Sequence, residues 1–402
     1  MSVATTARDV GLVGERASAR PIAAEGYIPE IDALRALAAL SVVVFHSGLP
    51  FDAGWMGVWL FFVISGFAIT TSLLNSEKKH NTRRAFLLNF YMRRTLRIWP
   101  LYFLFIGLCT LAALLSGQTE NLDYLPWVLT FTSNLRPIFL EDPQAHHWLP
   151  FSVLWSLGVE EQFYLIWPFL FLLVPRRFIG WVILGICVTS PLVRVLVSEI
   201  GRSLDWSEIK TAQVIYMLTP AQFSAFAGGC ALALFRRQIV TRPWLFPYAM
   251  ALAGTCLLLY VGFFSYQDIT LAKDGVTPGP WSLFRIFIYG GGREFFLYSI
   301  IWICSATLLI GVILRVKWLT ALCRIPGLQS VGRVSYGLYL FHAIVVWTLS
   351  TTVPGLVGIS GERDLGQSVT LLILTLLIAI PLSFLSFYQF ERRFISFRGR
   401  FW

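Results

Sequence analysis

Two ionisable residues of the first apolar segment, Arg35 and His46, have types and spacing suited to chemistry at a membrane. They are eleven residues apart, so on a helix they share nearly one face, about 16 Å apart along the axis. Histidine can take a proton from a hydroxyl near neutral pH and return it. Arginine stays charged, and its planar donors suit phosphate or carboxylate. We therefore predict proton transfer at one end of this helix and anion binding at the other. A snorkelling arginine and a core histidine are the alternatives for each residue alone.

A second polar stripe runs along the fourth apolar segment. Ser156, Glu160 and Tyr164 follow at intervals of four residues and share a helix face, whereas Glu161 points about 100° away. An ionisable residue within a span costs about 2.5–3.5 kcal/mol on insertion, so each one needs a partner. We predict that Glu160 is the buried partner of His46, where it would fix the imidazole tautomer and stabilise the imidazolium. The alternative is a hydrogen bond that only joins two helices.

A run of arginines precedes the third apolar segment. Arg94 and Arg97 are one turn apart and face the same way, with Arg93 beside them. Clustered guanidinium groups can hold the phosphates of a nucleotide-bearing donor. Anchoring to lipid headgroups is the alternative.

Two weaker signals lie elsewhere. The small pair Ser65-Gly66 within the second apolar segment allows either a close approach of two backbones or an open cavity. A further histidine, His342, lies in the ninth apolar segment, on a stripe with Leu338 and Ser335.

Long apolar helices must position these side chains. Of the 402 residues, 56% are hydrophobic and only 13% are charged. No soluble globular domain needs so large a fraction of apolar residues. Apolar runs long enough to cross a hydrocarbon core of about 30 Å recur along the chain. They predict an all-α polytopic membrane protein with about ten transmembrane helices, over residues 33–48, 54–74, 99–117, 152–174, 178–198, 213–235, 244–264, 295–315, 334–352 and 368–389.

The basic residues give an orientation. Most of the 32 lysines and arginines lie on one predicted side, which the positive-inside rule assigns to the cytoplasm. Both termini are then cytoplasmic, with residues 1–27 as a disordered tail, 28–395 as the transmembrane domain and 396–402 as a second tail. The net charge of +10 thus reflects orientation, and we expect no nucleic acid partner. The six cysteines lack disulfide or metal-ligand spacing, so we expect no metal.

Five motifs in order, spread over nearly the whole chain, resemble the membrane-bound acyltransferase-3 family, whose members O-acylate surface glycans. They comprise Asp32, Leu34, Arg35 and His46; Gly57 to Phe67, which includes Ser65; Arg93, Arg94, Arg97 and Pro100; Trp155 to Tyr164; and Ser335, Tyr336, Tyr339 and His342.

The resemblance implies acetyl-CoA or another acyl-CoA as the donor. It implies a surface polysaccharide, lipopolysaccharide, peptidoglycan precursor or lipid-linked glycan as the acceptor, at the bacterial inner membrane and in contact with membrane lipid. Donor phosphates would rest on the arginines, and His46 would either deprotonate the acceptor hydroxyl or carry the acyl group itself. The implied residues are His46, Glu160 and Arg35 for catalysis; Arg93, Arg94, Arg97 and Arg35 for the donor; and Asp32, Ser65, Ser156, Tyr164, Tyr336 and His342 for substrate or support.

The chain departs from the family pattern in two places. Trp59 stands where many members have an acid, so no role of that acid carries over. The chain ends at Trp402, soon after the last predicted span, so we expect no appended hydrolase-like domain. Transfer would then finish within the membrane domain or on a separate partner protein.

The longer outer segments 118–151 and 265–294 would be inert connectors or an acceptor-binding rim. The first contains His146, His147 and Trp148, and the second offers Arg285 and Arg293 to an anionic glycan.

Two other functions are compatible with the intramembrane charges. Arg35, His46 and Glu160 would form a proton relay in a transporter or flippase of a lipid-linked or phosphorylated solute. In a membrane scaffold or sensor without catalysis, the same charges would only join helices.

Overall fold

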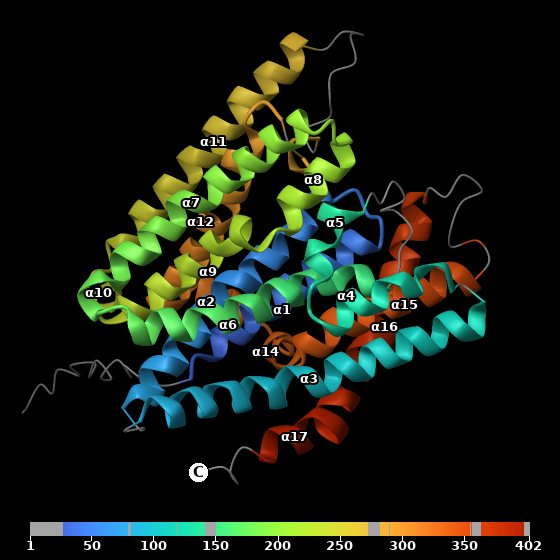
Figure 1. The fold of residues 1–402 in the computed structure, drawn as a ribbon, viewed down its shortest axis with the longest axis horizontal. Coiled ribbons are helices and arrows are strands. Elements are labelled where there is room, and N and C mark those ends of the chain that lie inside the picture. The colour runs from blue at the N-terminus through green and yellow to red at the C-terminus, as the bar shows by residue number, and fades with distance from the viewer. Residues whose placement is uncertain are drawn as a thin grey trace, which may run out of the picture.

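The computed structural model describes residues 27–78, 82–117, 119–140, 150–271, 282–288, 290–353, 355 and 363–397. All regular structure in these ranges is helical (Figure 1), which confirms the predicted all-α class. The predicted tail 1–27 lies outside the described residues except for Tyr27, and the tail 396–402 does so beyond Phe397.

The long helices carry most of the chain. They are α1 (Pro29–His46), α2 (Gly57–Glu77), α3 (Arg83–Ser116), α6 (Trp155–Leu173), α7 (Arg176–Ser203), α8 (Glu208–Met217), α9 (Thr219–Leu234), α11 (Leu245–Leu271), α12 (Arg293–Ile313), α15 (Ser335–Thr352) and α16 (Leu365–Ser386). Short helices connect them: α4 (Leu125–Leu129), α5 (Arg136–Phe139), α10 (Arg236–Val240), α13 (Lys317–Cys323), α14 (Leu328–Arg333) and α17 (Arg392–Ser396). Single 3₁₀ turns span Asp52–Met56, Thr119–Tyr124, Ser133–Leu135, Pro150–Leu154 and Ser282–Phe284, and a π turn spans Phe387–Glu391.

Seven helical stretches of the described chain are long and apolar enough to cross a membrane, so the protein is a multi-pass membrane protein. They include α2, α3, α7, α8 with α9, α11, α12 and α16. The other predicted spans correspond to α1, α6 and α15, which are 18 or 19 residues long and carry the polar residues singled out above. The count of ten spans and the cytoplasmic termini stay predictions.

Burial separates the central helices from the peripheral ones. In the most apolar stretch of α2, 61% of the residues are buried inside the protein, against 28% in the corresponding stretch of α7 and 11% in that of α11. The exposed side of α7 shows Leu184, Val188, Leu192 and Leu196 at intervals of four residues. Such a continuous apolar stripe suits contact with lipid.

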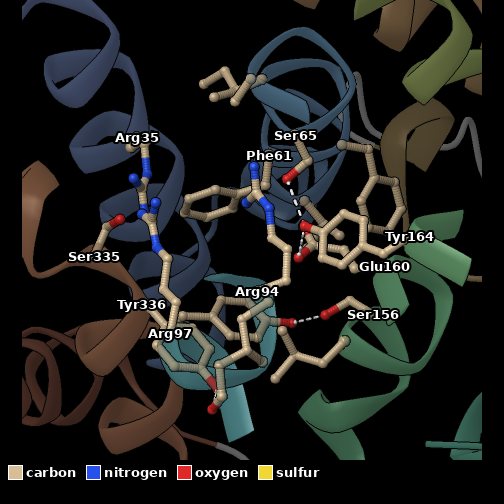
Figure 2. Close-up of a pocket in the computed structure, with 17 residues that line it drawn as sticks. Arg35, Phe61, Ser65, Arg94, Arg97, Ser156, Glu160, Tyr164, Ser335 and Tyr336 are labelled. Atoms are coloured by element: carbon tan, nitrogen blue, oxygen red, sulfur yellow. Dashed lines mark hydrogen bonds between the residues drawn. The ribbon is translucent and has the colours of Figure 1, made fainter. Parts of the chain in front are cut away.

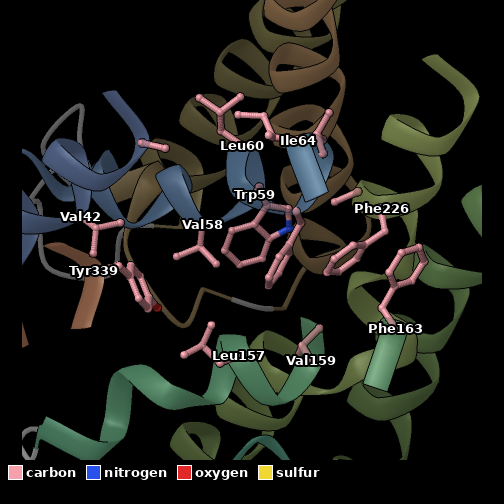
Figure 3. Close-up of a cluster of buried hydrophobic side chains, with 14 of the residues drawn as sticks. Val42, Val58, Trp59, Leu60, Ile64, Leu157, Val159, Phe163, Phe226 and Tyr339 are labelled. Carbon is pink, nitrogen blue, oxygen red and sulfur yellow. The ribbon is translucent and has the colours of Figure 1, made fainter. Parts of the chain in front are cut away.

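Glycines bring α2 and α9 into close contact. A Cβ atom added at Gly66 would lie 2.1 Å from the backbone oxygen of Phe226, and one added at Gly229 would lie 2.0 Å from that of Val63. Small residues permit this approach, since dispersion contacts rather than hydrophobic burial hold helices together in lipid. Beside this contact, Phe163 and Phe226 stack at 4.3 Å between ring centroids, in the core of Figure 3. Gly66 thus provides the close approach, which is one of the two alternatives that the Ser65-Gly66 pair allowed.

Two element boundaries differ from the sequence prediction. Helix α3 begins at Arg83 rather than near residue 99, because the hydroxyl of Thr82 caps it by accepting from the N–H of Ala85 at 3.2 Å. The arginine run therefore lies within a continuous helix of 34 residues. The predicted span 213–235 is two helices, since the backbone is extended at Leu218 and proline lies in the first turn of α9.

Candidate active site

Helices α1, α2, α3, α6 and α15 surround a cavity that we call the arginine cavity. Figure 2 shows the guanidinium groups of Arg35, Arg94 and Arg97 in it, with Glu160 and Tyr164 on the side opposite Arg35 and Arg97. The remaining polar lining consists of Ser65, Ser156, Ser335, Tyr336 and Tyr339. The shared faces predicted for Arg94 with Arg97, and for Ser156 with Glu160 and Tyr164, are confirmed.

Glu160 is held by hydroxyl groups within the arginine cavity. Its carboxylate accepts hydrogen bonds from Ser65 at 3.0 Å and from Tyr164 at 2.8 Å. It also interacts electrostatically with Arg94 and Arg35. Glu161 points elsewhere, as predicted, and accepts from Trp99 at 3.3 Å. Three guanidinium groups and one carboxylate line the arginine cavity, so its wall offers several charged donors to an anion.

The other predicted donor residues occupy different surroundings. Arg93 lines a neighbouring cavity with Asn75 and Ser76, at the far end of α2. Asp32 lies outside the arginine cavity lining, 4.0 Å from Arg35, and accepts a hydrogen bond from the hydroxyl of Tyr27. Arg93 and Arg94 therefore line different cavities. Asp32 contacts Arg35 from outside the arginine cavity.

Glu391 belongs to this charge cluster, although the sequence prediction missed it. It lies in the π turn, accepts from Ser386 at 3.1 Å and interacts electrostatically with Arg97 and Arg35. Its signal was present as an acid directly before Arg392, at the end of the last apolar run. The neighbouring arginines are typical of the cytoplasmic end of a span, so the acid beside them does not stand out in the sequence.

His46 pairs with His342, and not with Glu160 as predicted. Nδ1 of His46 lies 2.8 Å from Nε2 of His342, and the rings stack at 11° with centroids 5.0 Å apart. The hydrogen bonds of Glu160 go instead to Ser65 and Tyr164. The packing of α15 against α1 decided this pairing, since it places the two imidazoles in contact.

The hydrogen bonds of the histidine pair define its tautomers when both rings are neutral. Nδ1 of His342 lies 3.1 Å from the carbonyl oxygen of Leu338, which can only accept. Nδ1 of His342 therefore carries the proton, its Nε2 accepts, and Nδ1 of His46 donates to it. This leaves the lone pair of His46 on Nε2, which is the arrangement that a general base needs.

His46 lines a second cavity, which we call the histidine cavity. Its lining includes Trp55, Trp155, Gln213, Tyr216 and Phe287. It shares Val58 and Tyr339 with the arginine cavity. Arg35 and His46 therefore open onto adjacent cavities with Val58 and Tyr339 as a common wall.

Hydrogen bonds fix the side chain of Tyr339 in this wall. Its hydroxyl lies 2.7 Å from that of Ser156 and donates to the carbonyl oxygen of Val153 at 3.0 Å. Tyr336 lies about one turn earlier in α15 and donates to the carbonyl oxygen of Ile98 at 2.9 Å. The position of Tyr339 in the wall depends on helices far apart in the chain, so the motif that contains Tyr339 does not predict it.

Three cavities follow one another along α2. Val58 is common to the histidine and arginine cavities, and Ala68 is common to the arginine and Arg93 cavities. From Val58 to Asn75 the helix rises about 25 Å, close to the thickness of a hydrocarbon core. The row of cavities thus follows most of the length of a helix that is long enough to cross a membrane.

The predicted outer rim is only partly described. His146, His147 and Trp148 lie outside the described residues. Arg293 forms an ion pair with Asp268, which reduces its availability to an anionic glycan.

Comparisons with known proteins agree on one family. A family model described as an acyltransferase domain matches residues 28–388. The peptidoglycan O-acetyltransferase OatA of Listeria monocytogenes is 29% identical over 350 residues, which are 81% of this chain and 50% of that protein. A Bacillus subtilis protein named "Putative peptidoglycan O-acetyltransferase YrhL" is 30% identical over 342 residues, which again are 81% of this chain and 50% of that protein. The chain spans about half the length of the curated relatives it matches. No solved structure gives a significant match.

Proposed function

The chain belongs to the acyltransferase domain family, and from this premise we propose that it is a membrane O-acetyltransferase of cell-envelope glycans. It would take the acetyl group from cytoplasmic acetyl-CoA and transfer it to a sugar hydroxyl on the outer side of the bacterial inner membrane. The O-acetyltransferase names of its relatives support this reaction type. The observation that carries the proposal is the row of cavities along α2, with guanidinium groups in the middle and a histidine pair at one end.

The arginine cavity supports an anionic donor. Arg35, Arg94 and Arg97 can form charge-assisted, bidentate hydrogen bonds with phosphate, and Arg93 adds a further cation in the adjoining cavity. Glu160 and its hydroxyl partners would hold Arg94 and Arg35 in position while the cavity is empty. A phosphate-rich donor such as CoA matches this set of guanidinium donors better than a neutral acyl donor does.

The thioester must pass the common wall to reach His46. Val58 and Tyr339 separate the two cavities, so the thioester arm would displace the side chain of Tyr339. That movement breaks the contacts of the Tyr339 hydroxyl with Ser156 and Val153. A closed wall in the absence of donor would also keep water and protons from crossing.

In the histidine cavity, His46 would act as the general base. Nε2 of His46 takes the proton of the acceptor hydroxyl as its oxygen attacks the thioester carbonyl carbon. The C–O bond forms, the C–S bond breaks, and the proton passes from His46 to the departing CoA sulfur. His342 holds the other side of the His46 ring through its Nε2. An acetylated histidine that forms with donor alone would replace this direct transfer by a two-step path.

Mass spectrometry of surface glycans, from cells with and without the intact gene, tests the function. We expect acetylated sugars to disappear with the gene and to return with the wild-type chain, but not with His46→Ala. Val43→Ala is the matched control, since Val43 is a buried residue of the same helix outside both cavities. Restoration of acetylation by His46→Ala to the wild-type level would contradict the mechanism. Unchanged glycans on deletion of the gene would contradict the function.

A further inference from the structure

Two residues that line the histidine cavity each have a buried polar atom without a partner among the described residues. These atoms are Oε1 of Gln213, on α8, and the hydroxyl of Ser133, in the 3₁₀ turn Ser133–Leu135. Both residues line the cavity, and they are only 3% and 5% exposed. A buried polar atom without a partner is costly, so it is usually satisfied by water or a ligand.

Aromatic rings form much of the same cavity. Tyr216 is packed against Trp155 at 4.7 Å, Phe287 at 5.0 Å and Trp55 at 5.5 Å between ring centroids. The indole N–H of Trp55 donates to the carbonyl oxygen of Phe284 at 2.9 Å, which fixes that ring. Rings held in this way offer rigid apolar faces to a ligand.

Charge distinguishes this cavity from its neighbour. The described residues that line the histidine cavity include no aspartate, glutamate, lysine or arginine, whereas the arginine cavity has three guanidinium groups. An anionic group would lose its hydration here without gaining a charged partner. The cavity volume is about 130 Å³, which is similar to the ~150 Å³ that accommodates one benzene-sized ring.

We infer that the histidine cavity is a binding site for a single uncharged sugar ring, with Gln213 and Ser133 as its hydrogen-bonding residues. The inference rests on the proposed function, because it names the acceptor class at the site of His46. A sugar ring has apolar C–H faces for the aromatic side chains and hydroxyl groups for the two unpartnered atoms. Since a carbonyl oxygen accepts, Gln213 requires a hydroxyl or N–H of the sugar. An alkyl chain would fill the volume but leave both atoms unsatisfied.

Equilibrium binding of small glycosides to the full chain in lipid nanodiscs tests this site without requiring turnover. The probes are methyl N-acetylglucosaminide, which is neutral, and methyl glucuronide, which is anionic. We expect the neutral glycoside to bind and the anionic one to bind at least tenfold more weakly. Gln213→Met and Ser133→Ala should each raise the dissociation constant of the neutral glycoside about tenfold.

Matched controls separate binding from folding. Oε1 of Gln267 and the hydroxyl of Ser198 are likewise buried without a described partner, but these residues lie on α11 and α7 outside the histidine cavity. Gln267→Met and Ser198→Ala should leave glycoside binding unchanged. Thermal stabilisation by CoA in each variant reports that the donor side is intact.

Each outcome decides one of the two proposals. Unchanged glycoside affinity in both Gln213→Met and Ser133→Ala, absence of binding by the wild type, or displacement of the glycoside by decanol would overturn the sugar site. Glycoside binding that follows the expected pattern, without acetyl transfer from acetyl-CoA, would retain the sugar site and overturn the proposed function.

Discussion

Replacing His342 by alanine should slow acetyl transfer without weakening donor binding. The change removes Nε2 of His342, which lies 2.8 Å from Nδ1 of His46. His46 becomes an imidazolium as it takes the acceptor proton, so its Nδ1–H then donates as a charged group. The lost hydrogen bond therefore stabilises the transition state more than the ground state, and its loss should reduce kcat.

The size of the effect follows from that single contact. Hydrogen bonds to charged groups contribute about 1.5–3 kcal/mol, and each 1.36 kcal/mol corresponds to a factor of ten in rate. We expect kcat of His342→Ala to fall about 10- to 150-fold. His342→Gln should lose less, because the amide oxygen can accept from His46. His46→Ala should lose more, about 10²- to 10⁴-fold, because the base itself is removed.

Initial rates of transfer from radiolabelled acetyl-CoA, in membranes with equal amounts of each variant, give kcat and the KM for the donor. Val345→Ala is the control, because it shortens a buried side chain of α15 that lines neither cavity. A His342→Ala rate equal to that of Val345→Ala would refute the role of the histidine pair. A higher KM for the donor, with kcat unchanged, would assign His342 to donor binding instead.

Other consequences of the geometry can be measured separately. Arg94→Gln should raise the KM for acetyl-CoA at least tenfold. Arg93→Gln should raise this KM less, because Arg93 lines the neighbouring cavity. Equal effects of the two substitutions would contradict the separation of the two cavities. Gly66→Val should lower the free energy of unfolding by about 1–3 kcal/mol, seen as a lower Tm in detergent, because its side chain would collide with α9. Gly107→Ala, which meets no atom within 4 Å, is its control, and equal Tm values would exclude the close contact. Leu204→Cys, in a chain whose six native cysteines have been replaced, should react with a membrane-impermeant thiol reagent added outside the cell. Protection of this cysteine would reverse the predicted orientation.

Features that depend on one helix could be predicted from the sequence. The stripe of Ser156, Glu160 and Tyr164 and the pair of Arg94 and Arg97 follow from the helical repeat, and each set lies in the arginine cavity. The multi-pass membrane class follows from long apolar runs, because backbone groups in lipid must be satisfied within a helix.

Features that depend on contacts between helices needed the tertiary structure. His342 lies 296 residues from His46, and no spacing rule predicts which polar side chain of another helix will meet an imidazole. A buried carboxylate suits a histidine, so the sequence predicts Glu160 as the partner of His46, but helix packing places Glu160 against Ser65 and Tyr164 instead. The wall at Tyr339, and an oxygen of Gln213 that has no partner in the described part of the chain, likewise arise only where several helices meet. The repeat of a helix determines which residues share a face, whereas close packing between helices determines what that face contacts.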